Sequence, residues 1–123
     1  GARLMVDAAQ SVGVVPINAD QMGLDMVAFG GHKGLLGPHG IGGFYSNSAV
    51  EFEHPDGAKA DTAHSYCDVG SVPYAALSGL GAGIDFLLSR KHGIRSVHEH
   101  IRKITTDFIM LIKELEGLKC HGG

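Results

Sequence analysis

A glycine-dense segment between two apolar runs constrains the fold of this chain more than any other feature. Seven glycines fall within fourteen residues around His32 and Lys33: Gly30, Gly31, Gly34, Gly37, Gly40, Gly42 and Gly43. Glycine tolerates positive φ and lets the backbone approach a ligand closely. A solvated turn needs only one or two glycines, so the segment predicts a loop built around a ligand. Its residue order matches neither a Walker A phosphate loop nor the G-x-G-x-x-G dinucleotide fingerprint.

Short apolar runs on both sides of this loop indicate a buried sheet. We expect strands at residues 3–9, 26–30 and about 41–46, because each run is apolar almost throughout. Such runs are typical of a mainly parallel sheet that is covered on both faces. The connection after the first strand is broken by glycine and proline. We expect residues 14–15 to add a short strand and residues 19–22 to form a single helical turn.

The second half of the chain has a different periodicity. Residues 47–68 are polar and are predicted to be an irregular surface segment. From about Pro73 apolar residues recur three or four apart, which predicts a helix that stops near Gly93. A second helix is predicted over residues 94–115, and its single apolar stripe is interpreted as a packing face inside the protein. The order is therefore an α/β core that runs into a helical section.

Composition excludes several classes of protein. The chain has 123 residues and a formal net charge of −3, with scattered basic residues, which argues against a nucleic-acid partner. No apolar run approaches the roughly 20 residues needed to span a bilayer, so we expect no membrane partner. The chain begins without Met and directly with a strand-like run. We therefore expect it to be part of a longer protein.

The cysteines and histidines do not form a recognisable metal site. Cys67 and Cys120 have neither a disulfide-framework nor a zinc spacing, which indicates reduced thiols in the cytoplasm. We interpret Cys67 as a small buried residue rather than a nucleophile. His98 and His100 are two apart, so a helix would point them to different faces and they could not share an ion. No metal is expected.

Polar residues follow two of the predicted strands. Asp7 and Gln10 end the first strand, and His32 and Lys33 follow the second. Ligands of open α/β sheets bind beyond the carboxyl ends of the strands. If these strands are neighbours, a carboxylate and an amine therefore open into one crevice. The pattern alone leaves another interpretation open, in which Asp7 caps a helix and Lys33 is a solvated loop lysine.

Two segments together resemble a known family signature. Val6–Gly13 and Ala28–Tyr45 are similar to the Asp-x-x-Gln and His-Lys segments of class V aminotransferases, which include cysteine desulfurases and selenocysteine lyases. Gly70–Leu87 is similar to the family's Gly-Thr segment and the helix after it. The resemblance implies part of a fold-type I pyridoxal-phosphate transferase. Residues 1–92 would form the second half of its large domain, and residues 93–123 the linking helix and the start of the small domain.

The resemblance also implies a role for each matching residue. Lys33 would form the internal aldimine with pyridoxal 5'-phosphate, Asp7 would pair with the pyridine nitrogen, and Gln10 would donate to the phenolic oxygen. His32 would contact the cofactor phosphate. Ser71 would reach the phosphate of the other subunit of a homodimer, or else cap the following helix. A buried carboxylate at the ring nitrogen keeps that nitrogen protonated, as an electron sink requires, and a freed lysine is a natural general base.

The sequence departs from the family pattern at one position, and several of the family's functional parts are not among its residues. Gly30 stands where the family usually has a phosphate-binding Ser or Thr, so phosphate affinity is expected to be weaker or supplied from elsewhere. The phosphate turn, the ring-stacking aromatic, the substrate-binding arginine and the desulfurase cysteine lie outside these residues. The resemblance implies conversion of cysteine to alanine plus enzyme-bound sulfur, with aminotransfer or selenocysteine cleavage as alternatives. The residues also allow a non-catalytic phosphate- or nucleotide-binding module, or a piece that is inactive by itself.

Overall fold

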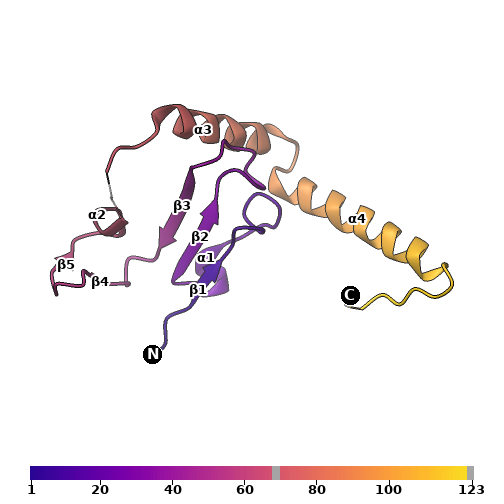
Figure 1. Ribbon diagram of the computed structural model, residues 1–123, viewed down its shortest axis with the longest axis horizontal. Coiled ribbons are helices and arrows are strands. Elements are labelled where there is room, and N and C mark those ends of the chain that lie inside the picture. The colour runs from indigo at the N-terminus through magenta and orange to yellow at the C-terminus, as the bar shows by residue number, and fades with distance from the viewer. Residues whose placement is uncertain (68–69, 122–123) are drawn as a thin grey trace.

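The computed structural model describes residues 1–67 and 70–121. Its elements in chain order are β1 (Met5–Asp7), α1 (Ala19–Met22), β2 (Met26–Gly30), β3 (Gly42–Ser46), β4 (Phe52–Glu53), β5 (Lys59–Ala60), α2 (Ala63–Cys67), α3 (Tyr74–Ser89) and α4 (Ile94–Lys113). Figure 1 shows α3 lying across one end of a three-stranded sheet, with the β4–β5 hairpin to one side and α4 projecting away. The predicted α/β class is confirmed.

The sheet has the order β1-β2-β3 and is mixed. Strands β1 and β2 are parallel, with Asp7 opposite Ala28, whereas β2 and β3 are antiparallel, with Gly30 opposite Gly42. A parallel neighbour requires a crossover of about a dozen residues or more, usually a helix. The glycine segment is short and contains no helix, so it turns the chain straight back. Among the described residues, only the β1–β2 pair is therefore parallel.

A polar clamp at the start of the sheet fixes the register of β1 against β2. The Arg3 guanidinium donates to Asp25 Oδ1 at 2.8 Å, and the Leu4 backbone N–H donates to Asp25 Oδ2 at 2.8 Å. The Asp25 side chain is only 16% exposed. A slip of one residue would turn every side chain of β1 to the other face of the sheet. The clamp therefore sets which way Asp7 points, and sequence periodicity gives no hint of it.

Substitution of Asp25 should flatten the acid dependence of stability. The hydrogen bond from the Leu4 N–H, and then that from Arg3, hold the pKa of Asp25 below its ordinary value of 3.8. A lowered pKa means that the stabilising contribution is complete above pH 3.8 and is lost as pH falls through the folded-state value. Urea unfolding at several pH values should show that the difference in unfolding free energy between the native chain and Asp25→Asn becomes smaller in acid. Asp85→Asn, at an exposed site on α3, should keep the pH dependence of the native chain. A difference between the native chain and Asp25→Asn that stays the same at every pH would contradict the role of the clamp.

Helix α3 packs against the glycine loop rather than along the strands. The buried core cluster consists of Leu35 from the loop with Leu80 and Leu87 from α3, and Ala8 and Val27 are the other buried apolar residues. The prediction of a sheet covered on both faces is wrong for the described residues. Met5 on β1, for example, is 53% exposed. The core therefore lies at the carboxyl ends of β1 and β2, where the loops meet α3.

The two long helices are confirmed, but their ends differ from the predictions. Helix α3 stops at Ser89 instead of near Gly93, because the chain becomes extended at Arg90. His92 and Gly93 then adopt positive φ values of 68° and 53°, which a right-handed helix cannot accommodate. Gly93 is therefore the residue that precedes α4. Helix α4 ends at Lys113, before the expected stop.

Two of the predicted connections have different local structures. Val14 and Val15 form no strand; their N–H groups both donate to the Ser11 carbonyl, at 3.0 and 2.7 Å, in a compact turn. The polar segment from Asn47 contains the β4–β5 hairpin and α2. Cys67 ends α2 and is exposed, so its interpretation as a buried residue is wrong. Asp68, the last residue of that predicted surface segment, lies outside the described residues.

The apolar stripe of α4 is exposed over most of its length. Ile94 and Val97 pack against the core cluster, but Phe108 and Leu111 farther along are 62% and 63% exposed. This follows from the direction of α4, which leads away from the sheet and α3 (Figure 1). The predicted packing face therefore has no cover over its second half within the described residues. In residues 1–67 and 70–121, no helix combines the length and apolar character that a membrane crossing requires.

Candidate functional site

Asp7 and Gln10 lie where β1 runs into a tight turn. The Asp7 Oδ1 atom accepts a hydrogen bond from the Ala9 N–H at 3.0 Å, as in an Asx-turn. The N–H groups of Ser11 and Val12 both donate to the Ala8 carbonyl at 3.0 Å, which closes the turn. Asp7 thus caps a turn and none of the described helices. Asp7 and Gln10 are both exposed.

His32 and Lys33 lie on a loop that its own backbone closes. The Gly31 N–H donates to the Ile41 carbonyl at 2.8 Å, and the Gly37 N–H donates to the Gly31 carbonyl at 2.8 Å. A further turn bond runs from the Leu36 N–H to the Lys33 carbonyl at 3.0 Å. Lys33 is half-buried and His32 is exposed. The lysine is therefore presented by a compact loop.

A direct contact between two glycines joins this loop to the turn after β1. Gly13 has a φ of +86°, and a Cβ placed on it would overlap the backbone of Gly34. A Cβ on Gly34 would in turn meet the Val12 carbonyl oxygen and come within 2.8 Å of Val14 Cγ2. Only two residues without side chains can pack this closely. The turn that bears Asp7 and Gln10 is thereby fixed beside the loop that bears Lys33.

Helix α3 holds the loop from its other side, again at glycines. A Cβ on Gly79 would lie 2.6 Å from Pro38 Cγ, and a Cβ on Gly31 or on Gly37 would lie 2.9 Å from Leu80 Cδ1. The sequence pattern predicts a loop that brings its backbone close to a ligand. In the structure these glycines bring backbone close to protein. Sequence reasoning misses their role in positioning the site because the contacts join residues far apart in the chain.

The two histidines of the loop form a stacked pair. The ring centroids of His32 and His39 are 4.5 Å apart, with an interplanar angle of 28°. Both side chains are exposed. Seven-residue spacing in a loop gives no sequence signal of such a contact. His64 lies in α2, away from this loop in Figure 1.

Asp7 and Lys33 are presented at the same edge of the sheet, where the parallel strands β1 and β2 end. Within the described residues, the ion pairs join Arg3 to Asp25, Lys59 to Glu51 and Lys103 to Asp107, so Asp7 and Lys33 do not neutralise each other. The carboxylate of Asp7 and the amine of Lys33 can therefore both interact with a bound ligand. Asp7 is exposed, whereas a buried carboxylate is the expectation from the sequence. A ring bound over it would have to provide that burial.

The chemistry of these groups fits pyridoxal 5'-phosphate. A carboxylate suits a protonated pyridine nitrogen, a half-buried amine suits the aldehyde, and an imidazole can donate a hydrogen bond to phosphate. Ser71 is exposed in the segment before α3. The residue before α3 is Pro73, and the helix has no side-chain cap hydrogen bond, so Ser71 does not cap it. No group of three His, Cys, Asp or Glu in residues 1–67 and 70–121 could hold a metal ion.

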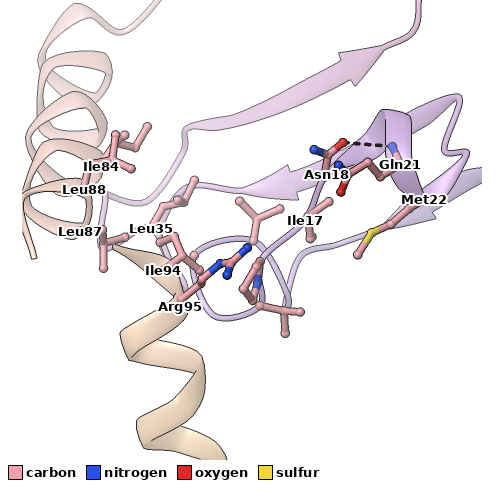
Figure 2. Close-up of a pocket in the computed structure, with 14 residues that line it drawn as sticks. Ile17, Asn18, Gln21, Met22, Leu35, Ile84, Leu87, Leu88, Ile94 and Arg95 are labelled. Atoms are coloured by element: carbon pink, nitrogen blue, oxygen red, sulfur yellow. Dashed lines mark hydrogen bonds between the residues drawn. The ribbon is translucent and has the colours of Figure 1, made fainter. Parts of the chain in front are cut away.

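An apolar groove elsewhere on the molecule is a separate feature. A groove of about 640 Å³ runs between the turn after β1, the end of α3 and the start of α4, with Leu35, Leu87 and Ile94 converging on it (Figure 2). Its walls are mostly apolar, and its lining includes neither Asp7 nor Lys33. It has no nucleophile or paired titratable groups. The candidate site is therefore the edge between the two loops, and the groove is not part of it.

Comparisons with known proteins agree on one family. The model of the family described as "Aminotransferase class-V" matches residues 1–123. A probable cysteine desulfurase from Methanothermobacter thermautotrophicus is 32% identical over 136 residues, which cover 99% of this chain and 34% of that protein. Another from Pyrococcus abyssi is 33% identical, covering 94% of this chain and 32% of that protein. The chain thus spans about a third of the length of these curated relatives.

A solved structure extends the likeness to three dimensions. The apo cysteine desulfurase from Thermococcus onnurineus NA1 superimposes with a TM-score of 0.76 at 29% sequence identity. The match covers 94% of this chain and 32% of that protein. The described arrangement of sheet, loop and helices is therefore similar to one third of a solved desulfurase.

Proposed function

Because the chain belongs to the class V aminotransferase family, we propose that it is the lysine-bearing part of a pyridoxal-phosphate enzyme that removes sulfur from cysteine. The observation that supports this most is the placement of Asp7 and Lys33 at one edge of the sheet. The Gly13–Gly34 contact holds their two loops together. A carboxylate and an amine in this arrangement could contact one pyridine ring, the carboxylate at its nitrogen and the amine at its aldehyde.

Each residue at the edge then has a distinct task toward the cofactor. Lys33 attaches it through the amine, and Asp7 holds the proton on the ring nitrogen by charge and hydrogen bonding. Gln10 donates to the phenolic oxygen from the turn after β1. His32 donates to the phosphate from the loop after β2. The bound cofactor supplies the electron sink that weakens bonds at the substrate Cα.

Lys33 would have a second task beside holding the cofactor. Its amine could accept a proton from the substrate carbon and return one to it. The backbone of Lys33 is fixed by the closed loop, which limits the positions that its amine can take. The same group therefore serves for attachment and for proton transfer.

The proposed reaction takes cysteine as substrate and leaves alanine, while the sulfur remains on an enzyme thiol. The names of the relatives favour this over aminotransfer or selenocysteine cleavage. Lys33, Asp7 and Gln10 would serve all three reactions. An assay of the full-length protein with cysteine should therefore yield alanine and bound sulfur. Formation of a keto acid instead would favour aminotransfer.

We also propose that the complete protein is a cytoplasmic homodimer. Ser71 is exposed in the segment before α3, which suits a hydroxyl that serves the phosphate of another subunit. The exposed apolar residues of α4 offer further surface for packing within such an assembly. A monomer in equilibrium sedimentation of the full-length protein would contradict this proposal.

The cofactor should attach to one lysine in preference to all others. Incubation of the chain with pyridoxal 5'-phosphate, borohydride reduction and peptide mapping should place the label on Lys33. Lys59 and Lys103 are the matched comparison, because both amines are already engaged in exposed ion pairs. Label spread evenly over the lysines would indicate surface chemistry and would contradict the proposal. A non-catalytic nucleotide-binding module would instead bind ATP and give no Lys33 label.

A further inference from the structure

The stacked pair of His32 and His39 is built into the loop by its backbone. Gly31 bonds through its N–H to Ile41 and through its carbonyl to Gly37, each at 2.8 Å. His32 follows Gly31 directly, and His39 lies between Gly37 and Ile41 in the returning arm. The two arms are thereby held side by side. The rings meet at 4.5 Å because the backbone already brings them together.

The arm that carries His39 is also anchored from outside. Pro38 has a fixed φ and packs against Gly79 of α3, where any side chain would collide with the proline ring. Gly40 follows with a φ of +82°, which turns the chain immediately after His39. His39 therefore projects from a segment with little conformational freedom, and its ring is a fixed surface against which His32 can lie.

Gly30 gives the His32 ring the space it occupies. A Cβ on Gly30 would lie 3.2 Å from His32 Cε1, which is tighter than ordinary contact, and 3.4 Å from His32 Nδ1. A serine or threonine at this position would require the imidazole to shift by a few tenths of an ångström from where it stacks. The absence of a side chain at Gly30 therefore removes a hydroxyl and also leaves the space in which the His32 ring stacks.

We propose that His39 is a positioning residue that holds the His32 imidazole for the phosphate of the cofactor, in the space left by Gly30. This rests on the proposed function and deepens it. A stacked ring loses less rotational freedom on binding than a free ring does. Its hydrogen bond to phosphate therefore contributes more to the binding affinity. In this chain the stack takes over part of the role of the absent hydroxyl.

The test compares two ligands that differ only in the phosphate. Apparent affinities for Lys33 are measured with pyridoxal 5'-phosphate and with pyridoxal, by absorbance and borohydride trapping. His39→Ala should lower the preference for the phosphorylated ligand by about two- to tenfold, the range expected for the loss of an aromatic pair. His39→Phe keeps a stacking ring and should retain most of the preference. Gly30→Ala, which adds the Cβ without a hydroxyl, should lower it, and His64→Ala should leave it unchanged.

A second measurement needs no cofactor. Inorganic phosphate is titrated against the chain while the ring resonances of His32 are followed by NMR. In the native chain the resonances should already show the ring-current shift of stacking and should respond to phosphate; in His39→Ala both effects should weaken. If Lys33 takes up neither ligand, the proposed function fails while this titration still decides the inference. An unchanged ligand preference and unchanged His32 response in His39→Ala would overturn the inference alone.

Discussion

Lys33→Ala is expected to abolish specific attachment of pyridoxal 5'-phosphate to this chain. The absorbance band of the bound cofactor should disappear, and borohydride-stable label should fall to the level set by surface lysines. No other amine of this loop can substitute, because Lys33 is the one lysine in residues 31–41. Spectrophotometric titration with reduction and mass measurement gives the result directly.

Two further variants test whether position 33 must carry a reactive amine or only a positive charge. Lys33→Arg keeps a cation on the loop, but a guanidinium does not lose its proton, so it should fail as completely as the alanine variant. Lys59→Ala removes an exposed amine elsewhere and should retain full incorporation at Lys33. Native-like labelling of Lys33→Ala would show that the cofactor is attached to another lysine and would end the assignment.

Gly13→Ala should cause the largest loss of stability among the simple substitutions. Alanine at a φ of +86° is strained by about 1–2 kcal/mol. The added Cβ would in addition overlap the Gly34 backbone, so the turn and the Lys33 loop must separate. We expect a total loss of about 3 kcal/mol or more, at the upper end of what single substitutions cause. Urea unfolding followed by circular dichroism measures it.

Gly23→Ala is the matched control for this prediction. Gly23 also has a positive φ, +66°, at the end of α1, but no atom lies within 4 Å of a Cβ placed there. This variant should therefore lose only the conformational part, about 1–2 kcal/mol. Equal losses in the two variants would show that the contact between Gly13 and Gly34 contributes nothing. Amide resonances of the Lys33 loop should shift in the first variant only.

Local periodicity is sufficient to predict most of the elements. The single turn of α1, strand β2 and the start of α3 lie where the sequence predicts them, because apolar spacing and flanking glycine and proline act over a few residues. Helix ends are harder to predict. The end of α3 depends on the extended conformation of Arg90 rather than on the nearest glycine.

Features that join distant residues cannot be predicted from periodicity. The antiparallel return of β3, the clamp of Arg3 on Asp25 and the contact of Gly13 with Gly34 depend on where the chain passes in space. The exposure of the α4 stripe is a further case. Amphipathic spacing predicts a face that can be buried, and whether another element covers that face depends on the rest of the fold.

The candidate site could be predicted from the sequence only in part. Polar residues that follow two neighbouring strands predict that Asp7 and Lys33 share an edge, and the structure places both strand ends there. The roles of Asp7, Gln10, His32, Lys33 and Ser71 toward a cofactor stay predictions. His39 has no sequence signal, because a ring contact between two arms of a loop follows from the hydrogen bonds of Gly31.

The closed loop around Lys33 also determines the timescale on which its amine can move. With Gly31 bonded in both directions and α3 packed on the far side, the main chain at Lys33 has no hinge of its own. Any travel of the nitrogen must then come from rotation about the four side-chain bonds. Such rotations take picoseconds to nanoseconds in accessible side chains, whereas loop opening takes far longer. Movement of this side chain would therefore not be the slow step of a catalytic cycle.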